Sequence, residues 1–445
     1  MGIRQAARFL TMVAQAGASR RRAAVMVAGT LACTLAIQMM ATAGTLAFAV
    51  LAPAIPGVAL ASVGVFLALV YVGGMIGSIC GGALVDRLGP VRTSQLSLLI
   101  QAAALCMLAS AEPWLRLPAA LALGLGYGPV TPASSQILAR TTSPERMSLV
   151  FSLKQTGVPL GGLLGGLALP PLTALWSWQA ALYMLAAAGT AVALLAQALR
   201  RQFDAVRAVP SLSRSPERGR GRAQPQPGMA ARAARHLAGP IADALSSPSL
   251  RALVTVSVLF SACQLSVSGY LMVFLTDEVG ISLTEAGMVY AVTQGAGVAG
   301  RIAWGHLADR TGSPRGVLVA LGMLMAVTLL AAACFSAQWP ALALAVAAAA
   351  LGATAIGWNG VYLGEVARLA PPGRVATATG GALFFTYLGV VAGPPAFGYL
   401  AQGTGSLGLA YGALAAMPAL AIALLRRAGR QALAAGDNAV PKERQ

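Results

Sequence analysis

Long runs of apolar residues, separated by short polar segments, form the main pattern of this 445-residue chain. A helix needs about 20 apolar residues to cross the roughly 30 Å hydrocarbon core of a bilayer. Breaks at charges and at Pro/Gly clusters predict twelve membrane-spanning helices, at 24–52, 57–84, 93–111, 117–138, 148–172, 179–199, 251–275, 283–307, 316–336, 341–364, 376–401 and 406–425. The predicted fold class is therefore an all-α membrane protein with 12 transmembrane helices.

The composition excludes several other classes of protein. Apolar residues make up 57% of the chain and charged residues only 10%, against about 25% charged residues in an ordinary soluble domain. The five cysteines all fall inside apolar runs, and there are only two histidines. No set of residues for nucleophilic or acid–base catalysis stands out. We predict no enzymatic activity, no cofactor and no metal site.

The basic residues show a strong asymmetry between the predicted loops. With the N-terminus placed inside, 28 of the 31 Lys and Arg residues fall in segments on the cytoplasmic side. Only Arg116 falls in an outside loop, and Lys154 and Arg301 fall within spans. Positive charge is retained on the cytoplasmic side of membrane proteins. Topology therefore explains the net charge of +18, nucleic-acid binding is not expected, and both termini are predicted to be cytoplasmic.

A segment near the second predicted helix recurs in the second half of the chain. With an offset of 223 residues, eight positions are identical. They are Gly74/Gly297, Gly77/Gly300, Gly82/Gly305, Leu84/Leu307, Asp86/Asp309, Arg87/Arg310, Gly89/Gly312 and Arg92/Arg315. A second repeat, with an offset of 228, relates Arg140, Pro144 and Arg146 to Arg368, Pro372 and Arg374. Duplicated units are common in secondary transporters.

The repeat divides the chain into two pseudo-symmetric six-helix bundles. We predict a cytoplasmic tail at 1–23, bundles at 24–199 and 251–425, and a second cytoplasmic tail at 426–445. Residues 200–250, which include R-S-P-E-R-G-R-G-R, are predicted to be an Arg-rich cytoplasmic linker.

The repeated loop resembles the hallmark of the major facilitator superfamily, G-x-L-A-D-R-x-G-x-x-R. The resemblance covers essentially the whole chain and implies two six-helix bundles that rock about a central site. It also implies that the loops latch the halves together in one conformation. The predicted latch residues are Gly82, Asp86, Arg87, Gly89, Arg92, Gly305, Asp309, Arg310, Gly312, Arg315 and Glu365. A tight turn with exposed charges is the alternative interpretation of the loop.

Two basic residues inside the predicted spans break the symmetry. Arg301 aligns with Ser78, and Lys154 aligns with Ala382. Each lies eight residues from its cytoplasmic loop, which is about 12 Å along a helix. Intramembrane charges are functional candidates by default. We predict that Arg301 and Lys154 bind an anion; snorkelling of Lys154 to the membrane surface is the alternative.

Arg301 carries a second resemblance, because the run R-I-A-W-G-H-L-A is similar to the eighth helix of monocarboxylate and oxalate carriers. That resemblance implies that Arg301 holds a substrate carboxylate. The first helix lacks the basic residue of that group and has Gln38 instead. Further predicted substrate-binding residues, each of which could instead join helices by a hydrogen bond, are Gln38, Gln264, Tyr270, Trp358, Asn359 and Tyr362.

These features predict a secondary transporter of a small organic anion, most simply a carboxylate, in a bacterial inner membrane. A proton or sodium ion could be the coupling ion, the lipid bilayer is its surrounding, and the protein is expected to be monomeric. One alternative is a proton-coupled efflux antiporter for drugs or metabolites. The other is a membrane sensor that signals through the Arg-rich linker.

Overall fold

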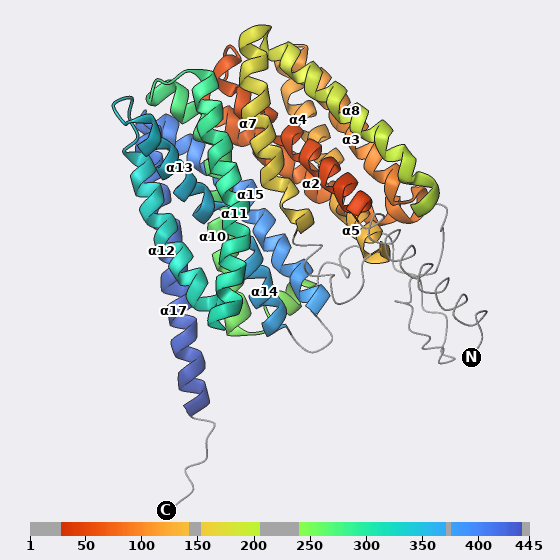
Figure 1. The fold of residues 1–445 in the computed structure, drawn as a ribbon. Helices are drawn as coiled ribbons and strands as arrows, with labels where there is room; N and C mark the ends of the chain where they lie inside the picture. Colours follow the sequence, from red (N-terminus) through yellow and green to blue (C-terminus); the bar gives the residue numbers. More distant parts are fainter. Residues whose placement is uncertain (1–27, 142–152, 205–239, 371–374, 438–445) are drawn as a thin grey trace, which may run out of the picture.

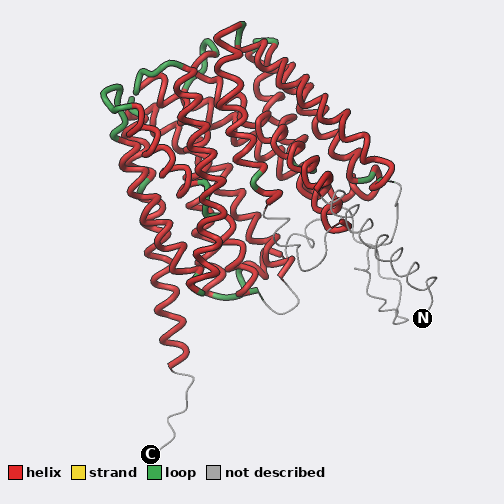
Figure 2. Tube along the Cα trace, in the orientation of Figure 1, coloured by secondary structure: helices red, strands yellow, loops and turns green. Residues whose placement is uncertain are grey.

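The computed structural model describes residues 28–141, 153–204, 240–370 and 375–437, and these residues form helices joined by short turns (Figure 2). The first half contains a first helix at Ala28–Ala54, which ends in η1 (Ala52–Ala54), and then α2 (Leu60–Leu88), α3 (Pro90–Ala109), η2 (Pro113–Leu115), α4 (Arg116–Tyr127), α5 (Val130–Thr141), α7 (Gly157–Leu175) and α8 (Trp178–Phe203). The second half contains α10 (Pro248–Val273), η4 (Phe274–Glu278), α11 (Leu283–Thr311), α12 (Pro314–Ala333), α13 (Ala341–Ala355), α14 (Asn359–Leu369), α15 (Val375–Thr404), α16 (Leu407–Leu414) and α17 (Ala416–Asp437).

The predicted helical fold class is confirmed, and each of the twelve expected spans overlaps a helical segment in the described part of the chain. Ten helices in the described part of the chain are long and apolar enough to cross a membrane. The fourth and eighth expected spans are not among these ten helices, and each has a physical reason. The fourth is divided into α4 and α5 at Gly128–Pro129, and α11 carries both charged and polar residues along its length.

The helices form two bundles that meet along two pairs of helices (Figure 1). Helix α2 packs against α15, and α7 packs against α11. Within each bundle a pair of helices related by the sequence repeat packs tightly, α2 with α4 and α11 with α13. A Cβ atom added to Gly124 would collide with the carbonyl oxygen of Val70, and one added to Gly352 would collide with that of Thr293. The offsets of 228 and 223 relate these two contacts, so the repeat is structural as well as sequential.

The two bundles are closed against each other at the outer end, the end that carries Leu60 and Leu283 and lies opposite the repeated loops. The Tyr270 hydroxyl donates a hydrogen bond of 2.9 Å to the carbonyl oxygen of Leu60 in the other bundle. Towards the loops the bundles diverge in Figure 1. Among the described residues, no hydrogen bond or ion pair joins the halves on the loop side of the contact between Arg301 and Gln155.

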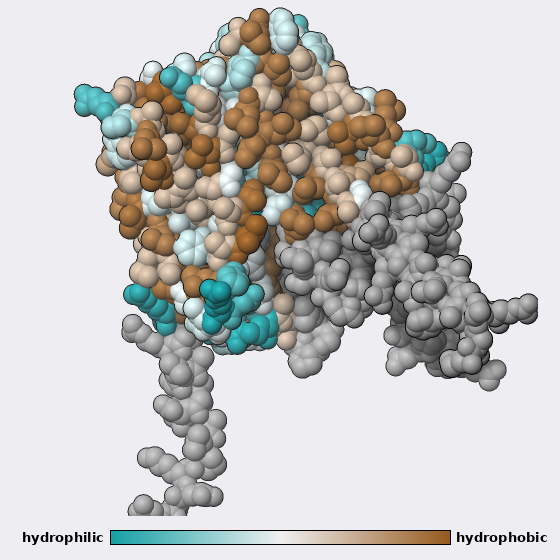
Figure 3. Space-filling model, in the orientation of Figure 1, coloured by the Kyte–Doolittle hydropathy of each residue, from teal (hydrophilic) through white to brown (hydrophobic). Residues whose placement is uncertain are grey.

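Serine residues cap four of the helices, and the surface agrees with a membrane setting. Ser177, Ser247, Ser282 and Ser406 cap the first turns of α8, α10, α11 and α16 by accepting main-chain N–H bonds. Such caps satisfy donors that have no partner within the helix. Figure 3 shows apolar side chains over most of the visible face, with hydrophilic groups near the ends. Exposed apolar surface of this extent requires lipid around it.

Two ends of the expected linker are helical. Helix α8 continues to Phe203, and residues 240–244 form a short helix that packs against Gly381. The tail at 1–23, the central part of the linker at 205–239, and the loop residues Pro144, Arg146, Pro372 and Arg374 lie outside the described residues.

Candidate functional site

Arg301 on α11 contacts main-chain carbonyls from both halves of the protein. Its Nε donates to the carbonyl oxygen of Ile356 at 3.1 Å, and one terminal nitrogen donates to that of Gln155 at 3.0 Å. Ile356 lies at the break between α13 and α14, and Gln155 directly follows Lys154. A guanidinium has five N–H donors. Several of them therefore remain after these two bonds.

Lys154 is buried beside this contact. The residue is only 1% exposed, and its ammonium donates one long hydrogen bond of 3.4 Å, to the Thr131 hydroxyl. The side chain therefore does not snorkel to the membrane surface in this conformation. The Arg301 guanidinium bonds the main-chain carbonyl of Gln155, the residue after Lys154, so Arg301 contacts the segment that carries Lys154 across the interface between the halves.

Among the described residues, neither cation has a carboxylate partner. In the part of the chain that the structure describes, the ion pairs are Arg315–Glu365 and Arg368–Glu365, both at the loop end of the second half. An unpaired charge inside a membrane protein costs several kcal/mol. An anion between Lys154 and Arg301 would offset that cost.

Polar side chains from the first helix and α4 surround the same region. Gln38 is buried, and its amide nitrogen donates to the Thr42 hydroxyl at 3.3 Å. Tyr127, the last residue of α4, packs its ring against that of Tyr71, with the centroids 6.1 Å apart. Sequence reasoning did not select Tyr127. The available signal was its position directly before the Gly128–Pro129 helix break.

Three of the predicted substrate residues bond one another in the second half. The Gln264 side-chain oxygen accepts from the Trp358 indole at 3.0 Å and from the Asn359 amide at 2.9 Å. The predicted Tyr362 is buried against Trp358, with their ring centroids 5.4 Å apart. These residues form a satisfied cluster at the start of α14.

The surroundings of Asn359 are more crowded on one side than its flanking glycines suggest. A Cβ atom on Gly357 would collide with the carbonyl oxygen of Ala353 and would lie 3.0 Å from Trp304. On Gly360 it would meet only the carbonyl oxygen of Arg301, at 3.8 Å. Open space therefore lies on the Gly360 side alone.

Tyr270 is not part of this group. It is fully buried at the outer end, where its ring packs 4.8 Å from that of Phe397 and its hydroxyl contacts Leu60. The structure thus places the predicted substrate residue Tyr270 in the contact that closes the outer end rather than beside Arg301.

Arg301 has a structural counterpart in the first half. Ser78, its equivalent at the offset of 223, donates its hydroxyl to the carbonyl oxygen of Gly128 at 3.0 Å. Gly128 and Ile356 are equivalent at the offset of 228, and each lies at a helix break. At both breaks the main-chain carbonyl accepts a hydrogen bond from a side chain of the neighbouring helix. The donor is a hydroxyl in the first half and a guanidinium in the second.

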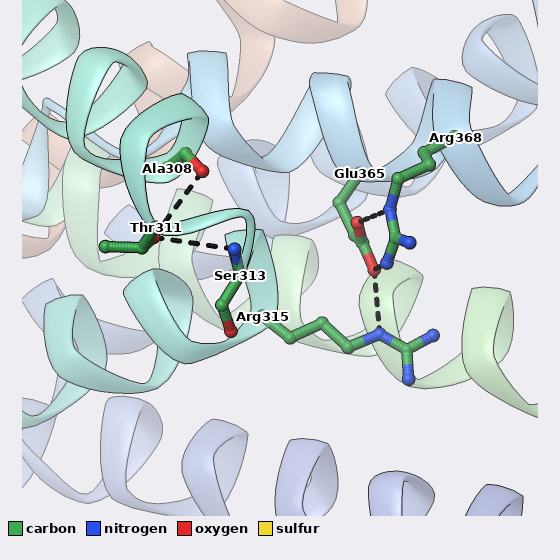
Figure 4. Close-up of polar contacts among 6 residues, drawn as sticks. All are labelled: Ala308, Thr311, Ser313, Arg315, Glu365 and Arg368. Carbon is green, nitrogen blue, oxygen red and sulfur yellow. Dashed lines mark hydrogen bonds and ion pairs between the residues drawn. The ribbon is translucent and has the colours of Figure 1, made fainter.

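The repeated loops are held differently in the two halves. In the second half, Glu365 is completely buried and accepts bonds from Arg315 at 2.8 Å and from Arg368 at 2.7 Å (Figure 4). Asp309 and Arg310 are exposed, as are Asp86 and Arg87 in the first half. None of these four makes an ion pair with another described residue in this conformation.

In the first half, a carboxylate from a different helix, Asp204 at the end of α8, holds the start of α3. Its carboxylate accepts from the main-chain nitrogens of Val91 at 2.9 Å and Arg92 at 3.2 Å, at the start of α3. Gly89 has a φ of 90°, and a Cβ atom there would collide with the Asp204 carboxylate. The glycine of the repeated motif therefore permits both the turn and this contact.

A family model and two related sequences all match this chain to the same class of membrane transporter. The family described as Major Facilitator Superfamily matches residues 31–394, with a second match at 269–442. An uncharacterized MFS-type transporter of Mycobacterium tuberculosis strain CDC 1551 is 25% identical over 320 residues, covering 72% of this chain and 66% of that protein. One from strain H37Rv is 26% identical over 233 residues, covering 52% of this chain and 47% of that protein. The chain thus spans less than two thirds of the length of these relatives.

Solved structures with the same fold include a bacterial homolog of the human lysosomal transporter Spinster, inward-facing and unoccupied, with a TM-score of 0.66 at 15% identity. That match covers 91% of this chain and 97% of the other. The peptide transporter POT in complex with sulfate has a TM-score of 0.66 at 19% identity, with 90% and 94% covered. At these identities the likeness concerns the fold.

Proposed function

This chain belongs to the major facilitator superfamily and is a multi-pass membrane transporter, and we propose that it carries a small organic anion whose carboxylate it recognises. The family match confirms the resemblance that the repeated loop motif indicated. The substrate class, the coupling ion and a location in the bacterial inner membrane are parts of our proposal.

The observation that carries the proposal is a pair of cations that form no ion pair with any residue in the described part of the chain. Lys154 belongs to the first half and Arg301 to the second, and the bond from Arg301 to the carbonyl of Gln155, the residue after Lys154, supports a shared role for them at the interface. A planar guanidinium binds a carboxylate through two parallel N–H bonds, and an ammonium adds a third donor without a geometric demand. This set of donors fits a carboxylate and repels a cation.

The same contact suggests how binding is coupled to movement. The guanidinium bond to the Gln155 carbonyl lies farther toward the loops than any other hydrogen bond between the halves in the described residues. A carboxylate that takes up this N–H donor replaces a bond between the halves by a bond to substrate. A ligand moves a two-state equilibrium by its difference in affinity for the two states, and this exchange supplies such a difference.

The energy source is a gradient rather than ATP, because the sequence has no G-x-x-x-x-G-K-[ST] phosphate-binding loop. In our proposal a proton, a sodium ion or a counter-anion drives the cycle. All carboxylates in the described residues lie at or near helix ends, so none is placed beside the two cations to carry a proton there.

Counterflow in proteoliposomes tests the proposal. Purified protein would be loaded with one carboxylate and assayed for uptake of labelled small carboxylates, organic amines and neutral amphiphiles. We expect exchange of carboxylates alone, reduced at least tenfold by Arg301→Gln. Arg116→Gln, in an exposed outer segment, is the matched control and should exchange normally. Uptake of amines or neutral amphiphiles that is insensitive to Arg301→Gln would instead support an efflux antiporter.

A further inference from the structure

We propose that Gln38 selects anions that carry a hydroxyl group, so that the preferred substrates are hydroxycarboxylates. This inference rests on the proposed function, because it concerns a second contact to the same substrate. It adds a neutral hydrogen-bond acceptor from the first helix to the two cations.

The side-chain oxygen of Gln38 has no hydrogen-bond partner although the residue is only 1% exposed. Its amide nitrogen is used, since it donates to the Thr42 hydroxyl. A buried polar atom without a partner costs about 1–3 kcal/mol. Unpaired buried atoms of this kind are uncommon, and a ligand that donates a proton to the atom would remove the cost.

Gln38 and Arg301 both contact the short segment that follows Lys154, because Arg301 donates to the carbonyl of Gln155 and Gln38 packs against Gly157. A Cβ atom on Gly157 would lie 2.9 Å from the Gln38 side chain, and Gly157 is one helical turn beyond Lys154. A ligand bound by Arg301 beside this segment would therefore lie on the side of the interface where the Gln38 amide packs.

Gln264 shows what a glutamine with a structural role looks like in the same protein. It occupies the first helix of the second half, as Gln38 occupies that of the first. Its side-chain oxygen accepts from both Trp358 and Asn359. The two glutamines thus differ at the side-chain oxygen. That of Gln264 accepts hydrogen bonds within the protein, whereas that of Gln38 accepts none from the described residues.

The electrostatics favour a hydroxyl over an ammonium group as the donor. An amino acid would bring a positive charge next to Lys154 and Arg301, and no carboxylate among the described residues pairs with either of them. A hydroxyl donates one proton without adding charge. Hydroxycarboxylates satisfy both conditions, whereas simple alkyl carboxylates lack the donor and oxo acids offer only an acceptor.

Three carboxylates of matched size distinguish these cases: propanoate, 2-hydroxypropanoate and 2-oxopropanoate. Isothermal titration calorimetry on the full-length protein in detergent would give the dissociation constant of each. We expect 2-hydroxypropanoate to bind about tenfold more tightly than propanoate, the factor for one neutral hydrogen bond made in a buried site. Gln38→Leu should remove that preference and keep the affinity for propanoate within about threefold.

Gln95→Leu is the control variant, because Gln95 bonds Ala193 and Gln197 within the first half, away from the two cations. It should keep the preference of the wild-type protein. Equal binding of all three anions would overturn the inference and leave the proposed function standing, as expected if water meets the Gln38 oxygen. Tightest binding of 2-oxopropanoate would also overturn it, since the amide nitrogen would then face the ligand. Binding of none of the three would count against the proposed function itself.

Discussion

Ser78 and Arg301 occupy equivalent positions in the two halves and do the same structural task with different chemical groups. Each donates to the carbonyl freed where the neighbouring helix breaks, at Gly128 in the first half and at Ile356 in the second. The first half shows that a serine hydroxyl is sufficient for this task. The positive charge and the remaining N–H groups of Arg301 therefore exceed what the helix break requires.

Lys154 and its repeat equivalent Ala382 also differ in charge, with the basic residue in only one half. A methyl group at position 382 is buried without difficulty in the second half, whereas the first half buries an ammonium with one long hydrogen bond. The repeated scaffold tolerates small residues at both positions. Inside the predicted spans, Lys154 and Arg301 are the basic residues that the repeat does not reproduce, and they are therefore our candidates for substrate binding. Five substitutions test this comparison.

The largest effect is expected from Arg301→Ser, which copies the first half into the second. The new hydroxyl can bond the Ile356 carbonyl as Ser78 bonds Gly128, so the helix break should survive. Loss of a charge-assisted bidentate contact worth about 3 kcal/mol should lower carboxylate exchange about 100-fold. Exchange in proteoliposomes and the melting temperature would be measured together. A variant that melts normally and transports normally would show that the guanidinium has only the structural task.

Gly124→Ala and Gly352→Ala test whether the two halves share one scaffold. Both glycines permit the close approach of a carbonyl from the facing helix, Val70 in one half and Thr293 in the other. A methyl group at either position forces the helices apart, at a cost of about 1–3 kcal/mol. Thermal unfolding should show similar losses for the two variants. A large loss in one and none in the other would contradict the structural repeat.

Much of this scaffold could be predicted from the sequence, and the reasons are physical. Long apolar runs predict membrane-spanning helices because only such runs are stable in lipid. The residues from Gly82 to Arg92 recur in the second half, and this recurrence indicates a duplicated unit. The bonds at Gln155 and Ile356 could not be predicted, because a main-chain carbonyl has no signature in the sequence. Asp204 was hidden for a different reason, since it stands next to an Arg-rich segment and looks like part of it.

The position of Tyr270 shows another limit. Composition and helix number place a tyrosine on a helix that faces the interface, but its depth along the interface decides which residues it meets. The structure places it against Leu60 at the outer end. Gln264, Trp358 and Asn359 were each predicted to bind substrate or to join helices by a hydrogen bond, and which partners they meet only became evident in three dimensions.

Lys154→Met should change binding and stability in opposite directions. Removing a buried ammonium that has no ion-pair partner relieves its desolvation cost, and methionine fills a similar volume. The melting temperature without ligand should therefore rise by a few degrees. Carboxylate affinity should fall about tenfold, corresponding to one charge-assisted contact. A fall in both quantities would instead indicate that the ammonium stabilises the empty protein.

Ser78→Ala should have the smallest effect. It removes the hydroxyl that satisfies the Gly128 carbonyl, which should cost about 1 kcal/mol in stability. Carboxylate exchange should stay within about twofold of the wild-type rate, because no charge is lost. Thermal unfolding and proteoliposome exchange measure the two quantities. A loss of exchange as large as that of Arg301→Ser would mean that the helix breaks, rather than the charge, govern transport.

The central claim is that Arg301 binds a carboxylate in addition to capping a helix break. Isothermal titration calorimetry of small carboxylates against wild-type protein, Arg301→Lys and Arg301→Ser tests it most directly. The account predicts measurable binding to the wild type, weaker binding to Arg301→Lys because the bidentate geometry is lost, and no detectable binding to Arg301→Ser. Equal carboxylate affinity in all three proteins would contradict it.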